Sequence, residues 1–112
     1  MDELRKGVCI RIAGNTGLPC LLALREKGYR LRLDYYRLGG PEVASPHYRL
    51  DYQAECDGGR FSATTPEELL GLVAMWEVRG DDWRLKPDEG TIDDELHAAS
   101  RTFDRGGNEL LE

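Results

Sequence analysis

Apolar and polar residues alternate with a period of two in two long stretches of the chain. In the first stretch, Leu31, Leu33 and Tyr35 alternate with Arg30, Arg32 and Asp34. In the second, the apolar positions are Tyr48, Leu50, Tyr52, Ala54 and Cys56, and the polar positions between them are Arg49, Asp51, Gln53 and Glu55. Because successive side chains of a strand point to opposite faces, this alternation predicts two strands, each with one apolar and one polar face.

Turn signals separate these strands and introduce a third. Residues 39–46 contain two glycines and two prolines and show no periodicity, so they are predicted to form a loop. Asp57-Gly58-Gly59 is typical of a tight hairpin and precedes a short strand predicted over residues 60–63. We therefore expect a three-stranded antiparallel meander.

A strand and a helix are predicted before the meander. Val8, Ile10 and Ile12 alternate with polar or small residues, as in a half-buried strand. The chain then turns, and Asn15 or Thr16 can cap a helix whose first turn accepts Pro19, because the amide that proline lacks is unpaired there in any case. Gly28 is expected to end this helix.

The start of the second helix is specified by Thr65-Pro66-Glu67-Glu68, with a capping threonine, a proline at the first helical position and a glutamate at the third. Apolar residues then recur at i, i+3, i+4 and i+7, namely at Leu69, Leu72, Val73 and Trp76. This spacing predicts that the helix packs on the sheet with Trp76 in the core and ends at Gly80.

A third helix is predicted near the C-terminus. It starts at Thr91, carries a thin apolar stripe that includes Ile92 and Phe103, and ends before Gly106-Gly107. Residues 81–85 are a candidate edge strand. The predicted fold class is therefore α+β: strand, helix, three-stranded antiparallel meander and helix in residues 1–86, followed by an acidic linker and C-terminal helix in residues 87–112, docked on the domain or bound to a partner.

The net charge of −6 comes from the last quarter of the chain. Residues 1–86 carry 13 basic and 13 acidic side chains, whereas residues 87–112 carry eight carboxylates against Arg101 and Arg105. A field of one sign speeds encounter with molecules of the opposite sign. This asymmetry predicts a basic partner.

Composition narrows the class of protein. Hydrophobic residues make up 40% and charged residues 32% of the 112 positions, which is typical of a globular domain. No apolar run approaches the length of a bilayer span, the charged N-terminus lacks a signal-like apolar stretch, and the three cysteines lack C-x-x-C spacing. We expect a soluble, cytoplasmic protein that binds no membrane and has reduced thiols.

The chain contains no motif of a specific chemistry. The turn at Gly14, Asn15, Thr16 and Gly17 lies where a strand meets a helix and could hold an anion, but it has neither the Walker lysine nor the G-x-G-x-x-G spacing. His47 and His97 have no metal-ligand spacing, and there is no G-x-S-x-G elbow. We expect no metal and no cofactor, and we lean against an enzyme, although a Cys-His pair brought together by the fold stays open.

The order helix, three strands, helix between Leu18 and Arg79 resembles the double-stranded RNA-binding domain. Members of that family present a basic start of the second helix to the phosphate backbone. Here the corresponding segment contains Glu67 and Glu68, whose carboxylates repel phosphates. We therefore expect no nucleic-acid partner.

Our functional hypothesis is a small, non-catalytic protein-binding domain, with an immunity or antitoxin-type inhibitor of a basic protein as one example. Tyr36 shares the polar strand face with arginines, as in contact surfaces, although a solvated face of cross-strand ion pairs explains the same pattern. The proposed partner-binding residues are Tyr36, Arg30, Arg32, Asp93, Asp94 and Glu95. A homodimer through the sheet edge or the terminal helix is one version of this hypothesis. The alternative is a small-ligand or anion-binding protein, in one version an enzyme, that uses Gly14, Asn15, Thr16 and Gly17.

Overall fold

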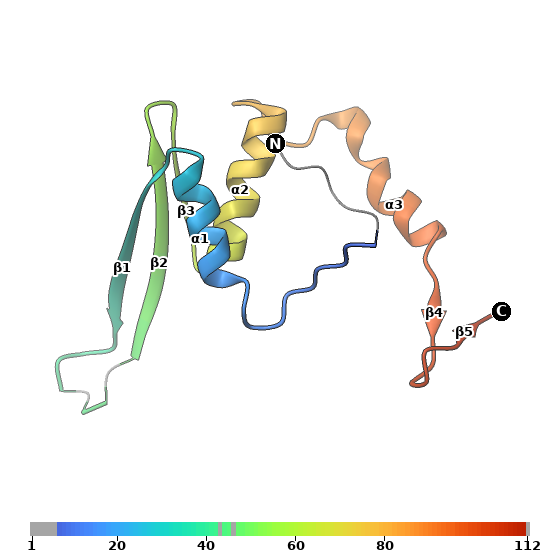
Figure 1. Ribbon diagram of the computed structural model, residues 1–112, viewed down its shortest axis with the longest axis horizontal. Coiled ribbons are helices and arrows are strands. Elements are labelled where there is room, and N and C mark those ends of the chain that lie inside the picture. The colour runs from blue at the N-terminus through green and yellow to red at the C-terminus, as the bar shows by residue number, and fades with distance from the viewer. Residues whose placement is uncertain (1–6, 43, 46, 112) are drawn as a thin grey trace. The chain divides into compact units, whose positions relative to one another are not determined.

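The computed structural model describes residues 7–42, 44–45 and 47–111, and it divides into two compact units, Met1–Asp81 and Asp82–Glu112. The acidic segment predicted from the sequence starts at Pro87, five residues after the start of the second unit. The first unit contains α1 (Gly17–Glu26), β1 (Arg30–Leu38), β2 (His47–Cys56), β3 (Gly59–Ala63) and α2 (Pro66–Arg79). The α+β class and the order helix, strands, helix are as predicted (Figure 1).

The three strands form an antiparallel meander in the order β1-β2-β3. The register between β1 and β2 runs without interruption from Arg30 opposite Glu55 to Leu38 opposite His47. β3 is shorter and pairs with the end of β2, from Tyr52 opposite Ala63 to Cys56 opposite Gly59. β1 is therefore a long edge strand, and its outer edge is unpaired among the described residues (Figure 1).

The core lies between the apolar sheet face and the two helices, which pack against each other. Its buried side chains are Leu24, Tyr29, Ala54, Leu69 and Val73. Phe61 extends this cluster through edge-on ring contacts with Tyr29, at 6.0 Å between centroids, and with Trp76, at 5.5 Å. Trp76 was expected in the core but is half-buried, because its indole Nε1 reaches out to donate to Asp81 Oδ1 at 2.8 Å.

The two ends of α2 follow the sequence signals. The Thr65 hydroxyl accepts a hydrogen bond from the backbone amide of Glu68 at 3.1 Å, and Pro66 occupies the first turn. Gly80 ends the helix with a φ of 78°, a conformation that favours glycine. At α1 the outcome differs, because Thr16 occupies the cap position but makes no side-chain capping hydrogen bond.

Two predicted strands do not form. Residues 8–12 have no regular secondary structure, and Val8, Ile10 and Ile12 are exposed. Residues 81–85 are likewise irregular. An alternating pattern marks a segment that can form a strand, but the strand also needs a neighbour to complete its hydrogen bonds. In the part of the chain that the structure describes, neither segment is paired with a strand in a sheet.

The second unit contains η1 (Pro87–Glu89), α3 (Thr91–Ala98) and a small hairpin of β4 (Thr102–Phe103) and β5 (Glu109–Leu110). The helix predicted to end just before Gly106 therefore ends at Ala98, seven residues before Arg105. Two local features follow Ala98. The hydroxyl of Ser100 donates to the backbone carbonyl of His97 at 2.8 Å. In the turn between β4 and β5, the Asp104 carboxylate accepts hydrogen bonds from the amides of Gly106 and Asn108, both at 2.9 Å, and Gly107 adopts a φ of 83°. These contacts favour a turn over a further helical turn.

No helix among the described residues is long and apolar enough to cross a bilayer.

Candidate functional site

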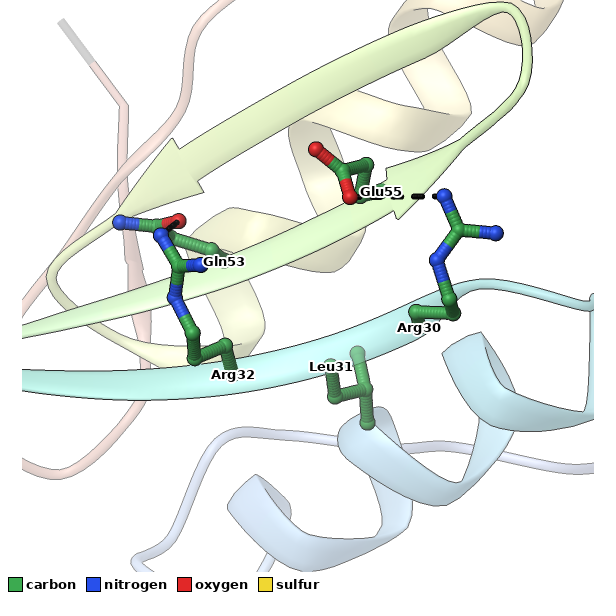
Figure 2. Close-up of a pocket in the computed structure, with 5 residues that line it drawn as sticks. All are labelled: Arg30, Leu31, Arg32, Gln53 and Glu55. Atoms are coloured by element: carbon green, nitrogen blue, oxygen red, sulfur yellow. Dashed lines mark hydrogen bonds and ion pairs between the residues drawn. The ribbon is translucent and has the colours of Figure 1, made fainter.

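The polar face of the sheet carries a small hollow of about 200 Å³, lined by Arg30, Leu31, Arg32, Gln53 and Glu55. Figure 2 shows that the four polar side chains leave β1 and β2 on one side, whereas Leu31 points to the other side, where α1 lies. The guanidinium of Arg30 lies 3.4 Å from the Glu55 carboxylate. The strict alternation in the sequence thus places these groups together on one face.

Gln53 is the centre of the polar network on this face. Its amide oxygen accepts hydrogen bonds from Arg32 at 2.7 Å and from Arg60 at 3.3 Å. Its amide nitrogen donates to Asp34 and to Asp51, both at 2.9 Å. One neutral side chain on the central strand therefore links charged groups of β1, β2 and β3.

Asp51 is held in its ionised form by this network. The hydrogen bond from Gln53 is the largest cause that lowers the pKa of Asp51, and the hydrogen bond from Ser62 is the second. The Ser62 hydroxyl lies 2.7 Å from one carboxylate oxygen of Asp51. A carboxylate stabilised in this way is a poor general base, because its proton affinity is reduced.

Tyr36 projects from the same face, as predicted, and is exposed. The guanidinium carbon of Arg49 lies 5.1 Å from the centre of its ring, at cation–π distance. Tyr36, Arg30 and Arg32 therefore share one face of β1, and each interacts with a residue of β2. In each of these cross-strand pairs the residue of β1 is exposed.

The other three predicted partner-binding residues, Asp93, Asp94 and Glu95, occupy consecutive exposed positions of α3 in the second unit. Asp93 lies 3.5 Å from Nδ1 of His97. Within the described part of the second unit, Asp94 and Glu95 have no ion-pair partner. Two of the three carboxylates are therefore not neutralised by their own unit.

The charge follows the division into units. Residues 82–112 carry nine acidic and four basic side chains, a net charge of −5, whereas residues 1–81 carry 12 acidic and 11 basic side chains, a net charge of −1. The structure thus assigns nearly the whole negative charge of the chain to the second unit.

Apolar side chains of the second unit are also exposed. In α3, Ile92 and Leu96 lie one turn apart and are 55% and 63% exposed. At 100° per residue, these two form a stripe with Asp93 and Glu95 on its two flanks and Asp94 on the opposite side of the helix. α3 has no buried residue. It therefore presents an apolar stripe between two carboxylates.

The turn at Gly14, Asn15, Thr16 and Gly17 borders a hollow of about 550 Å³, which is also lined by Leu18, Leu21, Tyr52 and Pro66. A carboxylate of the protein already lies at this turn. The Thr16 hydroxyl donates to Glu67 Oε2 at 2.7 Å, and the same oxygen lies 3.8 Å from the position of a Cβ on Gly17. The Thr16 hydrogen bond is the largest cause that lowers the pKa of Glu67. Glu67 thus supplies negative charge at the positive end of α1.

The thiols and imidazoles do not form a nucleophilic or metal-binding arrangement in the described residues. Burial raises the pKa of the Cys20 thiol, and the Glu67 carboxylate adds to this effect, so the reactive thiolate is disfavoured. His47 and His97 are both exposed, and they belong to different units. No group of three potential metal ligands occurs in residues 7–42, 44–45 and 47–111.

Two contributors to these sites were missed by the sequence analysis. Gln53 was placed on the polar face, but its role as the link between three strands depends on the register, which alternation alone does not give. Glu67 was interpreted as a first-turn residue of α2, and its bond to Thr16 spans 51 positions of the chain. No local pattern could have predicted that contact.

Comparison of the chain with protein-family models, with curated proteins and with solved structures found no match in any of the three.

Proposed function

We propose that the protein is a small, non-catalytic binding protein whose acidic second unit docks on a basic partner protein. The observation that carries this proposal is the charge division: the second unit holds a net charge of −5 of the total of −6. Electrostatic complementarity with a basic surface speeds encounter and selects the partner.

The surface of α3 supports a specific mode of docking. Burial of the exposed apolar area of a short helix in a groove is favourable. The flanking charges then favour a groove whose rims carry the opposite charge. Ile92 and Leu96 provide the apolar stripe, and Asp93 and Glu95 provide the flanking charges. The matching partner has an apolar groove with lysine or arginine on both rims. An immunity or antitoxin-type inhibitor of a basic protein is one class that fits this chemistry.

The alternative function, ligand binding at Gly14, Asn15, Thr16 and Gly17, is favoured by the adjacent hollow of about 550 Å³, a size typical of small-molecule pockets. Anions fit it poorly, because a phosphate or sulfate near Thr16 would meet the Glu67 carboxylate. A neutral ligand that packs against Leu18 and Tyr52 fits the lining better.

The test of the proposed function is capture of partners from a lysate of the source organism at low and at high salt. The full-length protein should recover a basic protein at about 50 mM salt and lose it at about 500 mM, because salt screens exposed charges. The variant D93N/D94N/E95Q should lose this partner. The matched variant E26Q/E42Q/D57N removes three exposed carboxylates of the first unit and should keep it. Equal recovery by both variants would contradict the proposal.

A further inference from the structure

β1 is an unusually accessible edge strand. It is nine residues long, contains no proline and pairs with β2 without a bulge. Proteins commonly protect such edges with prolines, bulges, or charges that repel a second strand. β1 does carry charges, at Arg30, Arg32 and Asp34. The order of those charges decides whether they repel a second strand or attract it.

The sequence of β1 is self-complementary when read in the antiparallel direction about Leu33. In a pairing centred on this residue, Arg32 of one copy lies opposite Asp34 of the other. Leu31 then lies opposite Tyr35, and Arg30 lies opposite Tyr36. Opposite charges, an aliphatic–aromatic pair and an arginine–tyrosine pair are all favourable cross-strand neighbours.

Neighbouring registers lack this property. Opposite residues of paired strands point to the same face of the sheet. The only registers that suit the alternation of β1 are therefore those that pair its apolar positions with apolar positions. A pairing centred on Arg32 places two arginines opposite each other, and a pairing centred on Asp34 places two aspartates opposite each other. Directly opposed like charges destabilise a sheet. Of these three registers, charge therefore favours the one centred on Leu33. Within the sheet itself, Asp34 does lie opposite Asp51, but there Gln53 donates to both carboxylates.

The apolar face of β1 also lacks cover. Leu33 and Tyr35 are 39% and 61% exposed. Beside them, a groove of about 300 Å³ between α1 and β1 is lined by Leu18, Leu21, Leu22, Arg25 and Leu31. In the register centred on Leu33, Tyr35 of the second copy lies opposite Leu31 and on the side of the groove. Its ring can cover apolar surface that a single copy leaves in water.

We propose that two copies of this chain pair through β1 as antiparallel strands centred on Leu33, which joins their sheets into one six-stranded sheet. The occupant of the edge is a second copy, because the charges and the apolar residues of β1 match those of β1 itself. This interaction is separate from partner binding by the acidic unit. In this dimer, Arg30, Arg32 and Tyr36 lie at the interface.

The first test is the mass of the purified protein by light scattering across a concentration series. The expected mass is about 25 kDa, twice the 12.6 kDa of one chain. D34R places arginine opposite Arg32 and should yield a monomer, whereas R32D/D34R restores opposite charges and should yield a dimer again. A wild-type monomer at every concentration up to about 1 mM would overturn the proposal. A D34R dimer as tight as the wild type would overturn it as well.

Cross-linking tests the register without relying on charge reversal. In a C9S background, which removes the exposed native thiol, L33C should form a covalent dimer under oxidant, because opposed residues of antiparallel strands lie within disulfide range. R37C lies on the same face of β1, but its two copies would be roughly 27 Å apart, eight residue steps along the strand, and should not cross-link. Equal cross-linking of both variants would overturn the register. Both tests use purified protein alone, so their outcome does not depend on the basic partner.

A monomer whose outward β1 amides are nevertheless protected from hydrogen exchange would also overturn the proposal. In that case residues 8–12 of the same chain, with their alternating Val8, Ile10 and Ile12, would be the segment that covers the edge.

Discussion

The hydroxyl of Thr16 donates a hydrogen bond of 2.7 Å to the carboxylate of Glu67, which joins the N-terminus of α1 to the first turn of α2. One carboxylate therefore lies near the positive ends of both helices, where negative charge is stabilising. This contact makes part of the stability of the first unit dependent on pH. It also occupies the turn at which an anion could bind.

We predict that E67Q removes a pH-dependent part of the stability. The folded-state pKa of Glu67 is lowered, mainly by Thr16, so the folded protein binds this proton less tightly than the unfolded chain. The stabilisation is present above the ordinary glutamate pKa of about 4.5 and is lost as the pH falls through the lower folded value. Melting temperatures of wild type and E67Q should differ at pH 6, and this difference should shrink as the pH falls below 4.5. The control E26Q changes an exposed glutamate of α1 and should follow the wild type at both pH values.

Phosphate, sulfate and nucleotides at millimolar concentration should not raise the melting temperature of the wild-type protein. A ligand that binds the native state must stabilise it, and the Glu67 carboxylate opposes an anion at the turn next to Thr16. A clear rise that disappears in N15A would show instead that the turn holds an anion.

Two valines of α2 test the position of the core. Val73 is 0% exposed and Val78 is 86% exposed. V73A deletes two buried methyl groups and should lower the free energy of unfolding by about 2 kcal/mol. V78A makes the same chemical change in water and should stay within about 0.5 kcal/mol of the wild type. Denaturant titrations followed by circular dichroism measure both, and similar losses would mean that α2 packs on a different face.

Trp76→Ala should cost about 2 kcal/mol, below the 3 to 5 kcal/mol typical of a fully buried aromatic residue. The ring is half-buried. Its truncation to alanine removes mainly the edge-on contact with Phe61 and the hydrogen bond to Asp81. The denaturant titration described for V73A and V78A measures this loss of stability. A cost above about 4 kcal/mol would place Trp76 at the centre of the core.

Q53A should raise the pKa of Asp51 towards the ordinary value for aspartate. The hydrogen bond from Gln53 is the largest cause that lowers the Asp51 pKa, and the bond from Ser62 is the next. The carboxyl carbon of Asp51 can be followed by NMR during a pH titration. S62A should produce a smaller rise, and a larger rise in S62A than in Q53A would reverse the assigned order of the two hydrogen bonds.

The sequence was informative wherever a local pattern is sufficient to define an element. The alternation around Leu33 and Tyr52, the capping signal at Thr65 and the stop at Gly80 correctly predicted the meander and α2. The prediction was wrong where an element depends on distant residues or on competing local bonds. Val8, Ile10 and Ile12 have the period of a strand but no partner strand among the described residues. After Ala98 the predicted C-terminal helix is replaced by the β4–β5 hairpin, whose turn is closed by hydrogen bonds to the Asp104 carboxylate.

In the candidate sites, too, the features set by local geometry were predicted and the contacts between distant residues were not. Alternation was enough to place Tyr36, Arg30 and Arg32 on one face, because strand geometry is local. The bond between Thr16 and Glu67 joins residues 51 positions apart and could not be derived from spacing. The end of α3 at Ala98 moved Arg101 and Phe103 out of the predicted helix, so the apolar stripe of that helix is shorter than the sequence suggested.

The central claim, that the acidic second unit docks on a basic partner, is tested most directly by the affinity of the captured partner for two charge-matched variants. D93N/E95Q removes the carboxylates that flank Ile92 and Leu96, and E42Q/D57N removes two exposed carboxylates of the first unit. The account predicts that D93N/E95Q weakens binding at least tenfold at low salt, about 1.4 kcal/mol, and that E42Q/D57N changes it less than threefold. Equal affinities of the two variants, or recovery of no basic protein by the wild type, would contradict the account.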